Sequence, residues 1–253
     1  NLYFDDPLMM NLFSHCEKCD MPVIFHIGKM GHDYGVVDDN GLPRLEKALA
    51  AFLEKGDIPA GTTLLGLGAL PTDNPRLTGM LGMHGNIAPN VMTQQCDLLI
   101  AVGMRFDDRV TGKTDEYAKQ AKIIHFDIDP SEINKNVKVD LALVGDCKET
   151  LASVSEFVKP AKHQVWIDGF KPYAEKEFNK VIDAALNPKD GPLLMGEVVR
   201  KVSEAANNEA VLVTDVGQNQ IWSCAYHEVK NGKFLTSGGM GTMGYSIPAA
   251  MGA

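Results

Sequence analysis

The sequence predicts an α/β fold in which a doubly wound parallel sheet is followed by the start of a second α/β domain. Short apolar runs of strand length alternate with helical segments, and this alternation is typical of a parallel sheet covered by helices. The alternation of strands and helices stops at a Pro/Gly cluster at residues 188–192 and then begins again, which indicates a second domain. A chain of 253 residues with 45% hydrophobic and 23% charged residues is long enough for both units.

The first predicted unit is a strand at residues 23–27 and a helix at residues 42–55, with a loop between them. Apolar residues recur in that helix at the spacing that places them on one face, namely Leu45, Leu49, Phe52 and Leu53. The alternation then predicts strands at residues 62–65, 98–102, 122–127 and 141–144. Helices are expected between and after them at residues 88–95 and 115–120, from Ser131 onward, and at residues 148–158.

Residues 160–164 are expected to form a linker, and a polar helical stretch at residues 166–186 leads to the Pro/Gly cluster. Beyond the cluster, the predicted elements are a helix at residues 195–206, a strand at 211–214, a helix at 220–226 and a helix from Ser246 onward. Because helix and strand alternate again, the second domain is expected to belong to the same fold class.

Composition argues against several classes of function. The net charge of -9 and the pI near 5.2 argue against a nucleic-acid-binding surface. The longest apolar run near the middle of the chain, residues 98–102, is far shorter than the roughly 20 residues that cross a bilayer. Five scattered cysteines fit a reducing compartment, so a cytoplasmic protein is expected. Cys16 and Cys19 have C-x-x-C spacing without a second pair, which is a weak indication of zinc or redox chemistry.

Residues 80–108 have the order of parts with which an α/β domain binds a nucleotide. Gly82 and Gly85 let the backbone approach a ligand closely, and the start of the following helix offers free N–H groups. Arg105 follows the strand at residues 98–102, at the carboxyl end where such sheets bind ligands. These residues by themselves predict a phosphate or dinucleotide ligand.

Several longer motifs carry a resemblance to a known family. MLGMHG and GMRFDDRVTGK closely resemble the central, FAD-binding domain of acetolactate synthase (acetohydroxyacid synthase), a thiamine diphosphate enzyme. Further motifs occur in the order of that family, namely GDIPAGTTLLGLGALP, IIHFDIDPSEINKN, VGDCK, TDVGQNQ and LTSGGMGTMGYSIPAAMGA. The resemblance is nearly continuous from residue 56 onward, and it identifies the chain as a piece of a catalytic large subunit.

The resemblance implies an extended FAD along the first domain. The residues that it places against FAD are Thr63, Leu64, Leu81, Gly82, Met83, His84, Gly103, Met104, Arg105, Phe106, Asp107, Asp127, Ile128 and Asp146. Asp127 ends a predicted strand, where an acid can accept a hydrogen bond from a ribose hydroxyl, although a helix-capping or turn acid is the alternative role. His84 has an alternative role as a turn histidine that bonds to the backbone.

The opening of the second domain resembles the diphosphate side of a thiamine diphosphate site. The residues implied there are Gln218, Asn219, Gly241, Thr242 and Met243. Amides of the glycine-rich loop at residues 238–244 can face phosphates or the thiazolium, while a tight turn between strand and helix is the alternative. Asn219 stands where the family usually has histidine, so no proton-handling role is transferred to it.

Two parts of the family's active site have no counterpart in the sequence. These enzymes hold Mg2+ through a Gly-Asp-Gly motif followed by Asn, and the chain has no Gly-Asp-Gly, so the Mg2+ ligands are expected outside it. No part of residues 1–56 resembles the pyrimidine-binding domain, whose glutamate activates the cofactor. No catalytic or metal-binding residue is therefore assigned, and the chain alone is expected to show no synthase activity.

The resemblance implies a role in branched-chain amino acid biosynthesis. The intact enzymes condense two 2-ketoacids, typically pyruvate, with loss of CO2, and thiamine diphosphate serves as the electron sink. The implied partners are a homo-oligomer of large subunits and a regulatory small subunit, without nucleic acid or membrane. The alternatives are a noncatalytic FAD- or nucleotide-binding module, or another thiamine diphosphate enzyme such as oxalyl-CoA decarboxylase or glyoxylate carboligase.

The amino-terminal segment departs from this family. DDPLMMNLFSHCEKCDMPVIFHIGK resembles part of a metal-dependent amidohydrolase barrel, in which His26 would lie near the metal. The following sequence supplies a different fold, so a metal-hydrolase fragment is a further alternative. The expected regions are an atypical segment at residues 1–55, the FAD-binding domain at 56–160, a linker and helix at 161–192, and a truncated thiamine diphosphate-binding domain at 193–253.

Overall fold

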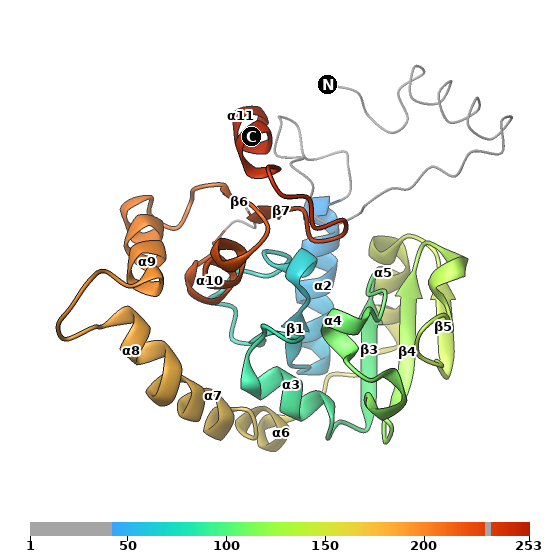
Figure 1. Cartoon of the computed structure of the whole chain (residues 1–253). Coiled ribbons are helices and arrows are strands. Elements are labelled where there is room, and N and C mark those ends of the chain that lie inside the picture. The colour runs from blue at the N-terminus through green and yellow to red at the C-terminus, as the bar shows by residue number, and fades with distance from the viewer. Residues whose placement is uncertain (1–41, 231–233) are drawn as a thin grey trace, which may run out of the picture.

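The computed structural model describes residues 42–230 and 234–253 and contains parallel sheets surrounded by helices (Figure 1). The strands are β1 (Ala60–Thr62), β2 (Leu77–Met80), β3 (Leu98–Val102), β4 (Lys122–Asp127), β5 (Leu141–Val144), β6 (Leu212–Thr214) and β7 (Phe234–Thr236). Within the described residues β1 pairs with β2, β4 lies between β3 and β5, and β6 pairs with β7. Every one of these pairings is parallel, which confirms the predicted α/β class.

Helices connect and cover these strands. Those of the first part are α2 (Leu42–Gly56), α3 (Ile87–Thr93), α4 (Asp108–Thr111) and α5 (Cys147–Phe157), with 3-10 turns η1 (Leu64–Gly66), η2 (Thr114–Glu116) and η3 (Pro130–Glu132). The later helices are α6 (Gln164–Asp168), α7 (Lys171–Glu177), the π-helical turn η4 (Phe178–Ile182), α8 (Asp183–Leu186), α9 (Met195–Ala205), α10 (Gln218–Tyr226) and α11 (Ser246–Gly252). Figure 1 shows α6, α7 and α8 following one another in an arc toward α9.

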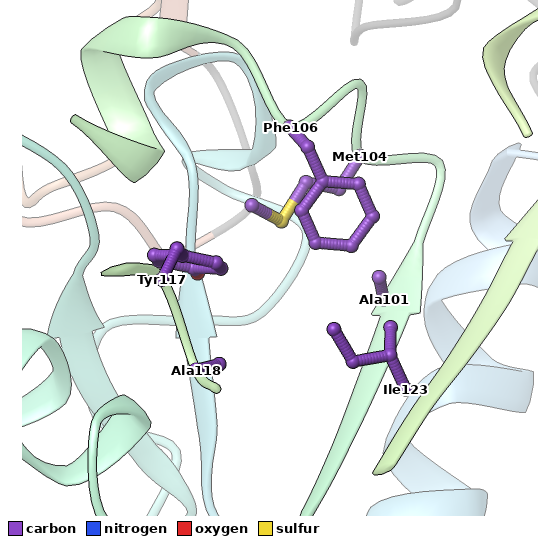
Figure 2. Packing of buried hydrophobic residues seen from close by; sticks show 6 residues of the cluster. All are labelled: Ala101, Met104, Phe106, Tyr117, Ala118 and Ile123. Carbon is purple, nitrogen blue, oxygen red and sulfur yellow. The ribbon is translucent and has the colours of Figure 1, made fainter. Parts of the chain in front are cut away.

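The central sheet is buried on both faces because its side chains alternate along each strand. In β3, Ile100 and Val102 belong to a core that also contains Phe52 of α2 and Leu151 of α5. Ala101 points the other way, into a second core that is drawn in Figure 2. The first core also includes side chains of β1 and β2, so the two-stranded and three-stranded sheets share one interior.

The second core covers the opposite face of β3 and β4. Its buried members are Ala101, Met104, Phe106, Tyr117, Ala118 and Ile123. The ring of Phe106 meets that of Tyr117 edge to face, with centroids 6.2 Å apart. Because both faces of the three-stranded sheet are covered, the doubly wound arrangement is confirmed for this part of the chain.

Most of the predicted elements are present. The strands at residues 98–102, 122–127 and 141–144 have the predicted bounds, and α2, α5 and α9 end within one residue of their predicted ends. The predicted strand at residues 62–65 is wrong for its last three residues. The Thr63 hydroxyl accepts a hydrogen bond from the N–H of Gly66, at 3.3 Å, and this bond begins a 3-10 turn.

Two predicted helices are only single turns. The segment at residues 115–120 forms η2 alone, because Ala118 takes a left-handed φ of 46° while its side chain is buried in the second core. The segment from Ser131 forms η3 alone, because Asn134 takes a φ of 61° and the helix cannot continue through that conformation. The predicted secondary structure was wrong at both places.

Strands β2 and β7 were not predicted. Both are short, and Gly79 lies inside β2, where a glycine weakens the sequence signal of a strand. The strand and loop predicted before residue 42, together with Cys16, Cys19 and His26, lie outside the described residues. No helix in the part of the chain that the structure describes is long and apolar enough to cross a membrane.

Candidate functional site

The carboxyl ends of the three central strands lie side by side. The hydrogen-bond ladder continues beyond the paired residues, since the Gly103 N–H donates to the Phe126 carbonyl oxygen at 2.8 Å and the Gly145 N–H donates to the Asp127 carbonyl oxygen at 2.9 Å. Three predicted site residues, Gly103, Asp127 and Asp146, therefore lie along one edge of this sheet. This edge is where parallel α/β sheets bind their ligands.

The first two strands end in a similar way. The Leu81 N–H donates to the Thr62 carbonyl oxygen at 2.7 Å, which places the predicted residues Thr63 and Leu81 at neighbouring strand ends. Leu64 begins η1 directly after Thr63. The sequence prediction thus selected residues at or directly after the carboxyl ends of β1 to β5.

The turn after β2 is fixed to the segment after β3. The Met83 N–H donates to the Arg109 carbonyl oxygen at 2.8 Å. The Asn90 side chain accepts a hydrogen bond from the Gly82 N–H at 3.0 Å and donates one to the Gly82 carbonyl oxygen at 2.9 Å. The predicted segment Leu81 to His84 is therefore bonded to α4, which directly follows the predicted segment Gly103 to Asp107, and the side chains of Met83 and His84 are exposed.

Side chains of the segment after β3 alternate between the core and the surface. Met104 and Phe106 are buried at 8% and 2% exposure, so only their backbone atoms can face a ligand. The Asp107 carboxylate caps α4 by accepting a hydrogen bond from the Arg109 N–H at 3.0 Å. Gly103 has a φ of 61°, and no atom lies within 4 Å of the position that a Cβ would take, so a ligand can approach its Cα.

Arg105 lies on the exposed side of this segment. Its carbonyl oxygen accepts a hydrogen bond from the Asn136 side-chain amide at 3.1 Å. No ion pair to its guanidinium is present within residues 42–230 and 234–253. An exposed arginine whose guanidinium makes no ion pair in this part of the chain is suited to bind a phosphate or another anion.

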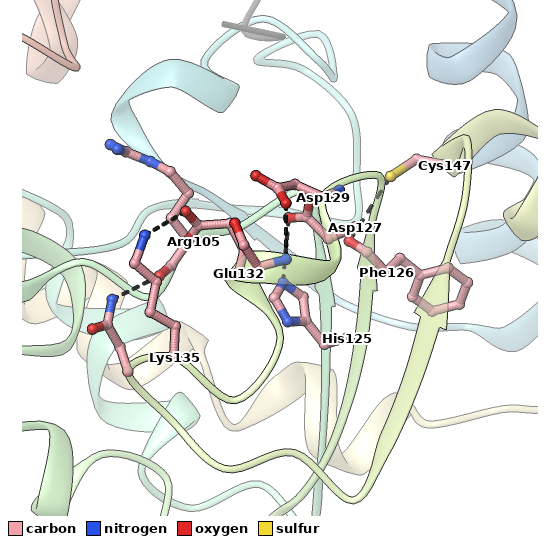
Figure 3. A network of polar contacts seen from close by, with 10 residues as sticks. Arg105, His125, Phe126, Asp127, Asp129, Glu132, Lys135 and Cys147 are labelled. Carbon is pink, nitrogen blue, oxygen red and sulfur yellow. Dashed lines mark hydrogen bonds and ion pairs between the residues drawn. The ribbon is translucent and has the colours of Figure 1, made fainter. Parts of the chain in front are cut away.

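Asp127 is a carboxylate that the fold keeps ionised at the end of β4. Burial by itself raises its pKa, but the neighbouring His125 ring and the backbone N–H of Asp129 outweigh that effect, so the carboxyl pKa lies below its ordinary value. The Asp129 N–H donates to Asp127 Oδ1 at 2.9 Å, and His125 Nε2 lies 3.5 Å from Oδ2 (Figure 3). An ionised acid at a strand end can accept hydrogen bonds from a ligand's hydroxyl groups.

The remaining predicted residues of this edge lie on either side of Asp127. The side chain of Ile128 is 54% exposed. Asp146 caps α5 by accepting hydrogen bonds from the N–H groups of Lys148, at 2.8 Å, and Glu149, at 3.4 Å. Burial raises the pKa of the next residue, Cys147, to about 11, so its thiol stays protonated at neutral pH.

The second domain repeats the arrangement at the ends of β6 and β7. Gln218 and Asn219 are exposed in the first turn of α10. The Asp215 carboxylate accepts hydrogen bonds from the N–H groups of Val216, at 2.8 Å, and Gly244, at 2.9 Å, and these bonds lower its pKa. This carboxylate holds the glycine-rich loop beside the start of α10.

The loop after β7 also touches the first domain. The predicted residues Gly241, Thr242 and Met243 are exposed on this loop. A Cβ added to Gly238 would lie 2.6 Å from Leu65 Cδ2 and 3.4 Å from Leu64 Cδ2, so the loop packs directly on η1. Leu64, one of the residues predicted for the first domain, thus contacts the loop that carries Gly241, Thr242 and Met243.

A separate cavity of about 480 Å³ lies between β2, the start of α3 and the segment from α7 to η4. Its lining includes Thr78, Asn86, Glu177 and Phe178. None of the predicted site residues lines it. The candidate site at the carboxyl ends of β1 to β5, called the strand-end site below, is therefore separate from this cavity.

Sequence reasoning missed four residues that shape the site, namely Asn90, His125, Asn136 and Asp215. His125, Asn136 and Asp215 stood within quoted motifs, and Asp215 could have been selected because it directly follows a predicted strand. Asn90 and Asn136 act through side-chain hydrogen bonds to Gly82 and to the Arg105 carbonyl oxygen, which local sequence patterns do not predict.

The residues at the first site fit the diphosphate and ribose of a nucleotide. They combine an approachable glycine at 103, a cation at 105 and an ionised acid at 127, which match a diphosphate and a ribose. No group of three or more His, Cys, Asp or Glu that could hold a metal ion occurs in the described part of the chain.

The parallel sheets and the strand-end residues are those of a cofactor-binding α/β protein. Comparison with protein families gives two matches. The thiamine pyrophosphate enzyme central domain matches residues 36–154, and the thiamine pyrophosphate enzyme C-terminal TPP binding domain matches residues 215–253. The chain belongs to the thiamine pyrophosphate enzyme family and is a homologue of acetolactate synthase large subunits.

Individual relatives share this name. The acetolactate synthase large subunit of Cyanidium caldarium is 44% identical over 213 residues, which are 81% of this chain and 35% of that protein. The probable acetolactate synthase large subunit of Methanocaldococcus jannaschii is 41% identical over 217 residues, covering 81% and 35%. The acetolactate synthase of Mycobacterium bovis is 42% identical over 212 residues, covering 81% and 34%. The chain spans about a third of the length of these relatives.

Proposed function

We propose that this chain is the cofactor-binding part of an acetolactate synthase large subunit and that its central domain binds FAD. The observation that carries the proposal is the alignment of predicted residues at one edge of the sheet, where Gly103, Asp127 and Gly145 are linked by backbone hydrogen bonds. An extended ligand along that edge meets a cation at Arg105 and an acid at Asp127.

The proposed roles follow from the geometry of each residue. Arg105 neutralises a diphosphate, Asp127 accepts hydrogen bonds from ribose hydroxyls, and the backbone at Gly82 and Gly103 allows close approach. Met104 and Phe106 support the site from the core and offer only backbone atoms. The FAD-binding domain is proposed at residues 56–160, after an atypical segment at 1–55.

The second domain, proposed at residues 193–253 after a linker and helix at 161–192, contributes to a thiamine diphosphate site. Gln218, Asn219 and the loop residues Gly241, Thr242 and Met243 are exposed at the ends of β6 and β7, where amides can face a diphosphate. Thiamine diphosphate, when bound, supplies an electron sink for decarboxylation of a 2-ketoacid. Ligands for Mg2+ are proposed to lie outside this chain.

The activity of the whole protein is proposed by analogy with its relatives. It is the condensation of two 2-ketoacids, with pyruvate as a substrate, in a cytoplasmic homo-oligomer of large subunits that a small subunit can regulate. This chain by itself is expected to form no acetolactate from pyruvate, because its sequence lacks the Gly-Asp-Gly motif.

The test of FAD binding is an absorbance spectrum of the full chain after incubation with FAD and gel filtration. The wild-type chain should retain the flavin band near about 450 nm. Arg105→Ala should lose most of it, whereas Lys113→Ala should keep it, because Lys113 is a nearby exposed cation that pairs with Glu116. Equal retention by both variants would contradict the role of Arg105, and a colourless wild-type chain would contradict FAD binding.

A further inference from the structure

His125 is a buried histidine in β4, two residues before Asp127 of the strand-end site. It is 0% exposed, and neither of its ring nitrogens has a hydrogen-bond partner in the described part of the chain. A buried polar group without a partner is costly, and native proteins rarely keep one without a reason. A buried ring that forms no hydrogen bond within these residues therefore points to a role outside packing.

The position of His125 directs one of these nitrogens toward the proposed ligand-binding acid. His125 and Asp127 are two residues apart in β4, so their side chains lie on the same face of the sheet. Nε2 of His125 lies 3.5 Å from Oδ2 of Asp127, slightly longer than a hydrogen bond (Figure 3). A ring that carries a proton on Nε2 becomes a donor to Asp127 after a small movement.

The His125 ring also contacts an aromatic side chain of the segment after β3. Phe106 meets it edge to face, with centroids 5.1 Å apart and an angle of 79° between the rings. Phe106 belongs to the segment that also carries Arg105, and it takes a left-handed φ of 52°. The segment that carries Arg105 is thus packed on His125, and His125 faces Asp127.

We infer that His125 is a positioning residue that fixes the Asp127 carboxylate for hydrogen bonding to the hydroxyl groups of a bound nucleotide; this inference rests on the proposed function. The Asp129 N–H donates to Oδ1 at 2.9 Å, and His125 Nε2 lies 3.5 Å from Oδ2, where a small movement would let it donate to that oxygen. A ligand-binding acid held at both oxygens loses less freedom when the ligand arrives.

The first test compares the FAD affinities of His125→Leu and His125→Gln in the full chain by flavin fluorescence titration. Leucine fills the space and cannot donate, whereas glutamine can present an N–H near the position of Nε2. His125→Leu should raise the Kd for FAD about tenfold, and His125→Gln should recover part of that loss. Wild-type affinity in His125→Leu, or equal losses in both variants, would overturn the inference.

The second test needs no ligand. The melting temperatures of wild type, His125→Leu, Asp127→Asn and the double variant form a double-mutant cycle. The inference predicts a non-additive result, because the effect of removing His125 depends on the charge that it faces. Additive shifts would overturn the inference. If the wild-type chain retains no FAD, the proposed function fails, and this cycle still decides whether the two residues are coupled.

Discussion

The backbone N–H of Met83 donates to the carbonyl oxygen of Arg109 across 2.8 Å, and this bond joins the turn after β2 to the helix after β3. Gly82 lies directly before the donor, with a φ of 102°. A Cβ at Gly82 would lie 2.8 Å from the same Arg109 carbonyl oxygen. The contact between the two segments therefore requires glycine at position 82.

Gly82→Ala should lower the free energy of unfolding by about 1–3 kcal/mol, because alanine meets both an unfavourable φ and a backbone clash. Urea unfolding measures the effect. Gly66→Ala is the matched control, since Gly66 has no positive φ and its nearest neighbour to an added Cβ is Thr63 Oγ1 at 3.4 Å. The control should change stability by less than about 0.5 kcal/mol. Equal effects of the two substitutions would contradict the proposed contact.

Phe106→Ala should destabilise the chain by about 3–5 kcal/mol, because the ring fills the second core and contacts Tyr117 and His125. Phe157→Ala serves as the comparison, since Phe157 is 83% exposed at the end of α5. Its effect should stay within about 0.5 kcal/mol. Denaturant unfolding of both variants measures the difference, and a small effect at Phe106 would mean that the second core is not packed as described.

Two substitutions at Asp146 separate its role as the N-cap of α5 from the effect of its negative charge. Asparagine is as good an N-cap as aspartate, so Asp146→Asn should leave the thermal stability nearly unchanged. Asp146→Ala removes the acceptor for the N–H groups of Lys148 and Glu149 and should cost about 1 kcal/mol. Thermal unfolding compares the two variants. An equal loss in both would show that charge, and not capping, is the contribution of Asp146 to stability.

Stability should depend on pH through Asp57. The His163 N–H donates to Asp57 Oδ2 at 2.5 Å and Arg76 pairs with Oδ1 at 2.5 Å, and these contacts hold the pKa of Asp57 below its ordinary value. A lowered folded-state pKa adds stability that is complete above the unfolded pKa of about 3.9 and is lost as the pH falls through the folded value.

Asp57→Asn is the matched variant, since asparagine also tolerates the left-handed φ of 54° at this position. Melting temperatures of both proteins should differ most near neutral pH and converge as the pH falls below about 4, because the unfolded chain protonates at its ordinary pKa and the folded carboxylate only at its lower one. A difference that stays constant from neutral pH to acid would contradict the lowered pKa.

The central strands could be predicted from the sequence because each is a short apolar run between turn residues. The bounds of β3, β4 and β5 depend mainly on that local pattern. Strand β2 could not be predicted, because Gly79 interrupts it and its stability comes from pairing with β1. The predicted helices at residues 115–120 and from Ser131 were wrong because Ala118 and Asn134 adopt left-handed conformations that tertiary packing or local turns select.

The features of the candidate site also divide into those that could be predicted from the sequence and those that could not. Residues directly after strands, such as Gly103 and Asp127, could be predicted from the order of strands and loops in the sequence. The orientation of the side chains around them could not be predicted. The burial of Met104 and Phe106 results from packing between segments that are separated in the sequence, and the His125 ring is placed by its edge-to-face contact with Phe106.

An equilibrium titration of the full chain with FAD, FMN and ADP tests most directly whether one extended dinucleotide lies across the strand ends. If the two linked halves of FAD contact different strand ends as proposed, FAD should bind at least about tenfold more tightly than either FMN or ADP, and ADP should compete with it. Binding of FMN or ADP as tight as that of FAD, or no binding of any of the three, would contradict a dinucleotide site at this edge.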